Sequence, residues 1–313
     1  MALAFAFPGQ GSQAVGMGKA LSDAFPAAKA VFDEVDAALG QKLSQVMWEG
    51  PQETLTLTEN AQPALMAVSV AVMKVLESEA GLDLARDAKF VAGHSLGEYS
   101  ALAAAGAFSI TDAAKLLKIR GQAMQKAVPV GTGAMAALLG VELDAAKALA
   151  AEAAQGEVCD VANDNGGGQV VVSGSKAAVE RAAELAKGKS IRAMMLPVSA
   201  PFHCALMQPA ADAMRDALSK VQVNKPVVPV VANVTASAVS DPKEIVDLLV
   251  RQVTGTVRWR ECVLAMAAAG VTDFVEAGSG KVLAGLVKRI VSGAAPVSIG
   301  TAEDIAAYKA RNA

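Results

Sequence analysis

The chain has 313 residues, enough for a large globular body with one extended core or a core and a subdomain. Its 28 Lys and Arg residues against 31 Asp and Glu residues give a net charge of −3, so the sequence offers no basic field for a nucleic-acid backbone. Hydrophobic residues make up 53% of the chain and aromatic residues only 4%, which predicts a core built mainly from Ala, Val and Leu.

The start of the chain and its cysteines indicate the compartment. Residues 1–7 are apolar but lack the positively charged start of a secretory signal, and no apolar run reaches the roughly 20 residues of a membrane helix. Cys159, Cys204 and Cys262 form no C-x-x-C pair, so they indicate neither a disulfide framework nor a zinc site, and we expect Cys204 to be buried and structural. We therefore expect a cytoplasmic protein with no metal site and with neither a membrane nor a nucleic acid as partner.

The order of apolar segments predicts the fold class. Runs rich in Val, Ile and Phe alternate with Ala-, Leu- and Lys-rich segments of helical period, the pattern of α/β folds with parallel strands. The predicted strands of this body are residues 2–7, 89–93, 227–231, 273–276 and 296–299.

The first strand is followed by a glycine-rich loop, residues 7–13 (FPGQGSQ). Such a loop lets backbone amides approach a ligand. Because it has neither a Walker lysine nor a complete G-x-G-x-x-G, it does not indicate a phosphate-binding loop.

Residues 90–98 (FVAGHSLGE) join an apolar strand to a G-x-S-x-G motif, and a helix-forming segment follows. A sharp strand-to-helix turn would need small residues at Gly93 and Gly97. It would lift Ser95 out of the sheet and direct backbone N–H groups at a developing oxyanion. The alternative is a glycine-flanked turn whose serine caps a helix. Because strand and helix stand in the expected places, we interpret Ser95 as a nucleophile that needs a base.

The helical segment 113–124 carries a cation on its apolar side. Winding at about 100° per residue places Lys115, Lys118 and Gln122 on one face and Arg120 on the apolar stripe. A guanidinium there is costly without a partner. A substrate carboxylate could be that partner, and so could an internal Asp or Glu, which residue counting alone favours.

The middle of the chain has a different order of predicted strands and helices. Strands are predicted at 135–139, 157–162, 170–173 and 191–198, helices at 143–154 and 176–186, and a turn at 163–168 (NDNGGG). This β-α-β-β-α-β order is that of a ferredoxin-like unit. We expect a subdomain at residues 128–197, inserted into a larger α/β body formed by residues 1–127 and 198–313.

Only two histidines are available as a base, His94 and His203. His94 directly precedes Ser95, and adjacent side chains in a tight turn point in different directions. His203 follows the proline-bracketed segment 197–202, where a rigid connection could direct an imidazole at the main body. Either histidine alone could be structural. The need of Ser95 for a base favours His203, and a carboxylate, an amide or a backbone carbonyl could orient its other ring nitrogen.

In combination, several motifs resemble those of the malonyl-CoA:acyl-carrier-protein transacylases of fatty acid synthesis. They occur in order between residue 4 and about residue 286, and they are residues 7–13, 93–98, 120, 163–174, 201–203 and 257–259. The chain is also similar to the acyltransferase domains of polyketide synthases, although its free-standing length favours the single enzyme.

The resemblance implies an α/β-hydrolase-like body with a ferredoxin-like subdomain, and it implies roles for residues. Ser95 would carry a malonyl ester, His203 would be its base, and Arg120 would hold the malonyl carboxylate. The resemblance further implies transfer of malonyl from malonyl-CoA to the phosphopantetheine thiol of acyl carrier protein by a ping-pong mechanism. Coenzyme A thioester would be a substrate, and no cofactor would be needed.

Three further positions take their roles from the resemblance alone. The backbone N–H groups of Gln10 and Leu96 would form an oxyanion hole, and Gln252 would orient the histidine through its main-chain carbonyl. The alternatives are a serine thioesterase or esterase with water as acceptor, an acyltransferase of a polyketide or malonate-catabolic pathway, and a non-catalytic module that binds acyl-CoA or carrier protein.

The sequence departs from the family pattern in two loops. Residues 163–169 have glycine where family members commonly carry proline, and Ser279 stands where proline is usual. These changes concern loop rigidity and carrier-protein docking rather than the chemistry. Because acyl carrier proteins are usually acidic, four basic residues are candidates for docking, although for any one of them a solvated surface charge is the favoured alternative: Lys187, Lys189, Arg192 and Lys281.

Overall fold

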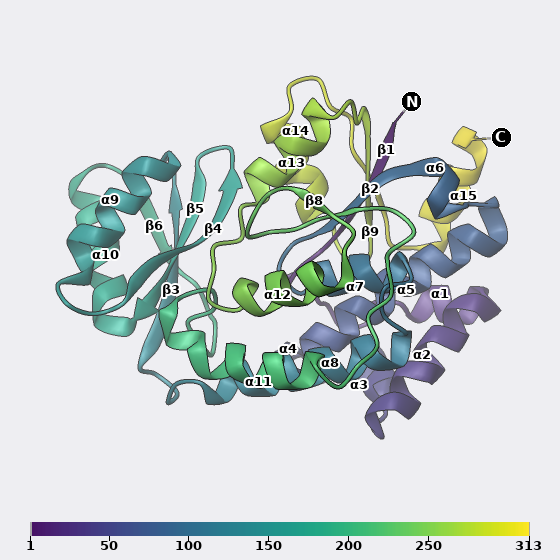
Figure 1. Cartoon of the computed structure of the whole chain (residues 1–313), viewed down its shortest axis with the longest axis horizontal. Helices are drawn as coiled ribbons and strands as arrows, with labels where there is room; N and C mark the ends of the chain where they lie inside the picture. The colour runs from purple at the N-terminus through teal and green to yellow at the C-terminus, as the bar shows by residue number, and fades with distance from the viewer. Residues whose placement is uncertain (1, 313) are drawn as a thin grey trace.

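Two β-sheets organise the protein, as the computed structural model shows for residues 2–312 (Figure 1). Sheet A has six strands in the order β10-β9-β1-β2-β7-β8, and sheet B has four in the order β4-β5-β3-β6. Sheet A is parallel except for the pairing of its edge strand β8, and sheet B is antiparallel. The α/β class expected from the sequence is thus confirmed.

The centre of sheet A is built from β1 (Leu3–Phe7), with β2 (Ala88–Gly93) on one side and β9 (Asp273–Ala277) on the other. In the parallel register Phe7 pairs with Gly93, so these strands end at the same edge of the sheet. The loops that follow β1 and β2 therefore begin side by side. The outer strands are β10 (Val297–Ile299), β7 (Val230–Val231) and β8 (Ala238–Val239).

Two predicted strands are shorter than expected. The segment 227–231 contributes only the two residues of β7, because Pro229 has no N–H for the ladder. The segment 191–198 forms a strand only over β6 (Arg192–Met195), because a proline follows at Pro197. The edge strand β8 was not predicted from the sequence.

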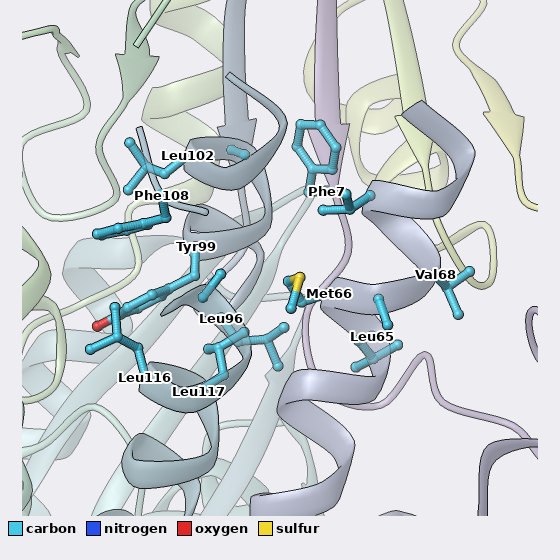
Figure 2. Close-up of a cluster of buried hydrophobic side chains, with 14 of the residues drawn as sticks. Phe7, Leu65, Met66, Val68, Leu96, Tyr99, Leu102, Phe108, Leu116 and Leu117 are labelled. Carbon is cyan, nitrogen blue, oxygen red and sulfur yellow. The ribbon is translucent and has the colours of Figure 1, made fainter. Parts of the chain in front are cut away.

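Helices cover both faces of sheet A (Figure 1). The longest is α5 (Thr58–Ala80), whose residues are mostly buried, as expected of a helix inside a large core. Figure 2 shows its Leu65 and Met66 below Phe7, in one buried cluster with side chains of α7 (Gly97–Ala104) and α8 (Ile110–Lys126). No helix within residues 2–312 is both long enough and apolar enough to cross a membrane.

The remaining helices of this body are short or medium in length. They are α1 (Lys19–Ala24), α2 (Pro26–Leu39), α3 (Leu43–Glu49), α4 (Gln52–Thr56), α6 (Leu84–Asp87), the 3-10 turn η1 (Ala205–Met207), α11 (Gln208–Leu218), α12 (Pro242–Gln252), α13 (Trp259–Ala268), α14 (Val282–Ile290) and α15 (Ala302–Asn312).

Sheet B follows the predicted β-α-β-β-α-β order. Its elements are β3 (Gly133–Leu139), α9 (Leu143–Ala154), β4 (Cys159–Gly166), β5 (Gln169–Ser175), α10 (Lys176–Gly188) and β6. Leu138, Leu149, Val172 and Val179 belong to a separate apolar core between this sheet and its two helices. The ferredoxin-like order expected from the sequence is confirmed.

The turn predicted at residues 163–168 is wrong in extent. β4 continues through most of this segment and pairs with β5, so that only two residues separate the strands. Nε of Arg260 donates to the buried carboxylate of Asp164 over 2.8 Å. Partners from the main body therefore hold a polar segment in extended conformation against its own turn preference.

Candidate active site

Ser95 lies in a very tight turn between β2 and α7. Its φ of 55° is in the left-handed region, which is costly for a residue with a side chain. A Cβ atom on Gly93 would lie 1.8 Å from the carbonyl carbon of Gly97, and one on Gly97 would lie 2.2 Å from the carbonyl oxygen of Phe7. Both glycines are therefore required by close packing, and the turn presents Ser95 at the edge of sheet A.

The serine meets His203 directly. Oγ of Ser95 lies 2.7 Å from Nε2 of His203, and Nδ1 of His203 lies 2.8 Å from the carbonyl oxygen of Gln252. A carbonyl oxygen can only accept, so Nδ1 must carry the ring proton. The lone pair of Nε2 then faces the serine hydroxyl, which is the arrangement required of a general base.

His203 is almost fully buried, and this sets its charge. Burial, and then the positive charge of Arg120, lower the pKa of His203 to about 3. The imidazole is thus neutral at neutral pH and ready to accept a proton. The other histidine, His94, makes a hydrogen bond with Oδ1 of Asn165 over 2.9 Å and lies against the ring of Trp259, so its imidazole has different partners.

Arg120 is 1% exposed and reaches the serine. One terminal nitrogen donates to Oε1 of Gln62 over 2.8 Å; the other donates to Oε1 of Gln252 over 2.9 Å and to Oγ of Ser95 over 3.2 Å. Its Nε has no partner within the described residues. No Asp or Glu of residues 2–312 forms a direct ion pair with this guanidinium, so the alternative of a directly paired internal acid is wrong; the buried Glu98 acts on Arg120 only through space. A buried charge held only by neutral groups suits an anionic ligand.

A polar layer lies behind the serine. Nε2 of Gln252 donates to the carbonyl oxygen of Ser95 and to the carboxyl group of Glu98, both over 3.0 Å. The side chain of Asn233 accepts from the N–H of Ser95 over 2.8 Å. Burial raises the pKa of Glu98 to about 7, against the opposing effect of hydrogen bonds from the Asn233 N–H and the Gln252 amide.

Three residues of this arrangement were not predicted from the sequence. Asn233 follows β7 at the carboxyl edge of sheet A, where parallel strands present functional groups, and this position was a usable signal. Glu98 directly follows the G-x-S-x-G motif. Gln62 has no such signal, because it lies within α5 among buried apolar residues.

A cavity of about 330 Å³ brings the predicted residues together. Ser95, His203 and Arg120 line it with Gln10 and Leu96, whereas Gln252 lies behind its wall. No hydrogen-bond acceptor within residues 2–312 takes the backbone N–H of Gln10 or of Leu96, so both groups are available to a ligand. The remaining wall is mostly apolar and comes from sheet B and from loops and helices of the main body: Gly11, Gln13, Thr56, Gln62, His94, Met124, Met135, Asn163, Leu196, Pro197, Val198 and Phe202.

Ser279, the glycines at residues 166–168 and the four basic docking candidates lie outside this cavity. The hydroxyl of Ser279 donates to the carbonyl oxygen of Ser12 over 2.8 Å, so the serine links its loop to the glycine-rich loop. The docking candidates are all exposed. Lys189 among them pairs with Glu152 over 2.7 Å.

The chain is similar to known proteins over most of its length. Residues 4–305 match the family described as acyl transferase domain. The malonyl CoA-acyl carrier protein transacylase of Escherichia coli (strain K12) is 48% identical over 290 residues, which cover 92% of this chain and 92% of that protein.

Solved structures superpose closely on the chain. An acyl-carrier-protein S-malonyltransferase from Bartonella henselae gives a TM-score of 0.96 at 57% identity, with 98% of each chain covered. A malonyl-transacylase in complex with its type II polyketide-synthase acyl-carrier protein gives a TM-score of 0.96 at 40% identity, with 100% of each chain covered.

Proposed function

We propose that this chain, which belongs to the acyl transferase domain family, transfers the malonyl group from malonyl-CoA to the phosphopantetheine thiol of an acyl carrier protein. The relatives and solved structures that resemble it over nearly their whole length carry this activity in their names. One observation carries the proposal. A Ser–His pair and a buried arginine without an acidic partner share one cavity.

The first half of the reaction loads the enzyme. Oγ of Ser95 attacks the thioester carbonyl carbon of malonyl-CoA, and its proton passes to Nε2 of His203 as the C–O bond forms. The oxyanion accepts hydrogen bonds from the free N–H groups of Gln10 and Leu96. When this intermediate collapses, the C–S bond breaks, and the sulfur takes the proton from Nε2 and leaves as coenzyme A.

The second half reverses these steps with a different thiol. The phosphopantetheine thiol gives its proton to Nε2 of His203, and its sulfur attacks the ester carbonyl carbon. The C–O bond to Ser95 then breaks, and Oγ recovers the proton. The carbonyl of Gln252 keeps the imidazole in one tautomer through both halves.

Arg120 supplies selectivity in this scheme. One of its terminal nitrogens lies 3.2 Å from Oγ of Ser95, and the malonyl carboxylate would pair directly with the guanidinium, as no Asp or Glu of residues 2–312 does. Acetyl-CoA would leave this buried charge unpaired, and such a loss discriminates strongly between substrates.

The proposed chemistry uses side chains and backbone amides alone, so we assign it no metal or redox cofactor. We also propose a cytoplasmic location, where the three buried cysteines, all free of disulfide bonds, would stay reduced.

Intact mass after brief mixing with malonyl-CoA tests the proposal. We expect a malonyl adduct on the wild-type protein and none on Ser95→Ala. An adduct that persists in Ser95→Ala would refute the nucleophile. A wild-type protein that shows no adduct but releases malonate would be a hydrolase, and one with neither adduct nor turnover would be a binding module.

A further inference from the structure

Asn233 occupies a special place behind the nucleophile. It is fully buried, with 0% of its surface exposed, and it follows β7, the strand beside β2. It does not line the cavity, so it cannot touch a substrate. Its influence on the reaction must therefore pass through other residues.

The side chain of Asn233 bonds to the backbone of the serine turn at two points. Nδ2 donates to the carbonyl oxygen of Gly93 over 2.7 Å, and Oδ1 accepts from the N–H of Ser95 over 2.8 Å. These groups flank the one residue between them, His94. The single side-chain amide of Asn233 thus links the last residue of β2 to Ser95, which has the left-handed backbone conformation.

The amide is itself held in one orientation. Nε2 of Gln252 donates to Oδ1 over 3.1 Å, and the backbone N–H of Asn233 donates to Oε2 of Glu98 over 2.9 Å. Because Oδ1 receives two N–H donors and Nδ2 faces a carbonyl, an exchange of the two atoms would oppose donor to donor. The orientation of the amide follows from its partners.

One consequence concerns the choice of oxyanion donors. Asn233 occupies the N–H of Ser95, whereas the N–H groups of Leu96 and Gln10 have no acceptor among residues 2–312, and both of these residues line the cavity. In the serine turn, the N–H of Ser95 is thus taken, and the N–H of Leu96 stays available to an oxyanion.

We propose that Asn233 is a positioning residue for acyl transfer, which holds Ser95 Oγ on His203 and leaves the N–H of Leu96 for the oxyanion. This inference rests on the proposed function, because it assumes that Ser95 is the nucleophile. Small displacements of a reacting group cost about 10²-fold in rate. Loss of the amide should therefore slow acylation of Ser95 by about 10²-fold or more, with little change in affinity for malonyl-CoA.

The test compares Asn233→Ala and the isosteric Asn233→Asp with Asn60→Ala. Asn60 is a buried amide that donates to the carbonyl oxygen of Thr54 and accepts from the side chains of Gln41 and Lys118, away from the serine turn, so Asn60→Ala controls for the loss of a buried amide. Three quantities are measured on each protein: the rate of malonyl adduct formation, malonyl-CoA affinity by calorimetry in a Ser95→Ala background, and Tm.

A second reagent measures the reactivity of Ser95 without coenzyme A. Phenylmethanesulfonyl fluoride transfers its sulfonyl group to an activated serine oxygen as fluoride leaves, so its rate reports how well Ser95 meets His203. We expect both Asn233 variants to lose about 10²-fold with this reagent also, while Asn60→Ala reacts like the wild type.

The outcomes separate this inference from the proposed function. An adduct on the wild-type protein establishes the nucleophile independently of any Asn233 variant. If both Asn233 variants fold and acylate within threefold of Asn60→Ala, or if affinity falls as much as rate, the positioning role is wrong. Should Asn233→Ala fail to fold, Asn233→Asp decides by the same criteria, because it keeps an oxygen for the Ser95 N–H and loses the donor to Gly93. If Asn233→Asp also fails to fold, Asn233 is needed for the fold itself and the positioning role is wrong.

Discussion

The two reacting side chains stand on loops of nearly equal strain that are held in different ways. Ser95 has a φ of 55° and His203 a φ of 58°. The serine turn depends on its own glycines, which pack too closely for any side chain, and its backbone also bonds to the side chain of Asn233. The ring of His203 is held from a distance, by the carbonyl of Gln252. Local sequence can therefore specify the close packing of the first loop, whereas the partner of the histidine depends on the assembled fold.

This difference explains what the sequence could predict. The motif around Ser95 could be recognised from the sequence, because each of its glycines is required by a close contact inside the turn or with β1. His203 was selected because it was the better placed of two histidines, and the contact with Gln252 was expected only from family resemblance. Nothing near His203 in the sequence specifies a partner 49 residues away.

The same distinction applies to the rest of the molecule. Alternating apolar runs predicted the strands β1, β2 and β9 and the order of sheet B, because periodicity reports burial directly. It could not predict that β4 would continue through residues 163–166, because the ion pair of Asp164 with Arg260 joins segments 96 residues apart. The neutral partners of Arg120 were hidden for the same reason.

The largest expected effect comes from removing the base. His203→Ala should lower the rate of adduct formation by about 10⁴-fold, the upper range for general-base catalysis. His94→Ala is the matched control, because it removes the other imidazole of the same cavity without removing the partner of Ser95 Oγ. Rapid-quench mass measurement should show a much smaller loss there. Equal losses in the two variants would contradict the assignment.

Removal of the buried cation should have the next largest effect. Arg120→Ala should reduce malonyl loading by about 2–5 kcal/mol in kcat/KM, the range for losing one partner of a buried charge pair. Loading by acetyl-CoA should fall less, so the preference between the two thioesters should shift toward acetyl. Lys115→Ala, on the exposed face of the same helix, is the control. An unchanged malonyl-to-acetyl ratio in Arg120→Ala would exclude the selectivity role.

The close packing of the glycines in the serine turn can be tested by measuring the stability of glycine variants. Gly97→Ala should cost about 3 kcal/mol or more in the free energy of unfolding, because the new Cβ would lie 2.2 Å from a backbone oxygen. Gly188→Ala, where a Cβ meets nothing within 4 Å, should change stability by less than about 1 kcal/mol. Urea unfolding measures both, and similar values would contradict the steric account.

The buried acid and base of the site should give opposite pH dependences of stability. The pKa of Glu98 is raised to about 7, so its contribution is complete below pH 4.5 and is lost as pH rises through about 7. The pKa of His203 is lowered to about 3, so its contribution is complete above pH 6.5 and is lost as pH falls toward 3.

Glu98→Gln separates the two contributions. This substitution removes the titration of residue 98 and keeps that of His203. The variant should therefore gain stability relative to the wild type as pH rises from 5 to 8, because only the wild type loses the contribution of Glu98. Urea unfolding at several pH values gives this difference, and a difference that does not vary with pH would contradict the raised pKa.

The rate of acylation by wild-type protein should show no loss near pH 6.5, because His203 stays neutral there.

The most direct test of the central claim follows the fate of an isolated malonyl-enzyme. Protein loaded with labelled malonyl-CoA and freed of coenzyme A is divided between buffer alone and buffer with phosphopantetheinylated acyl carrier protein. Transfer through Ser95 and His203 predicts rapid appearance of malonyl-carrier protein and only slow release of malonate in buffer alone. Rapid release of malonate at a rate that carrier protein does not change would contradict the transferase assignment and indicate a hydrolase.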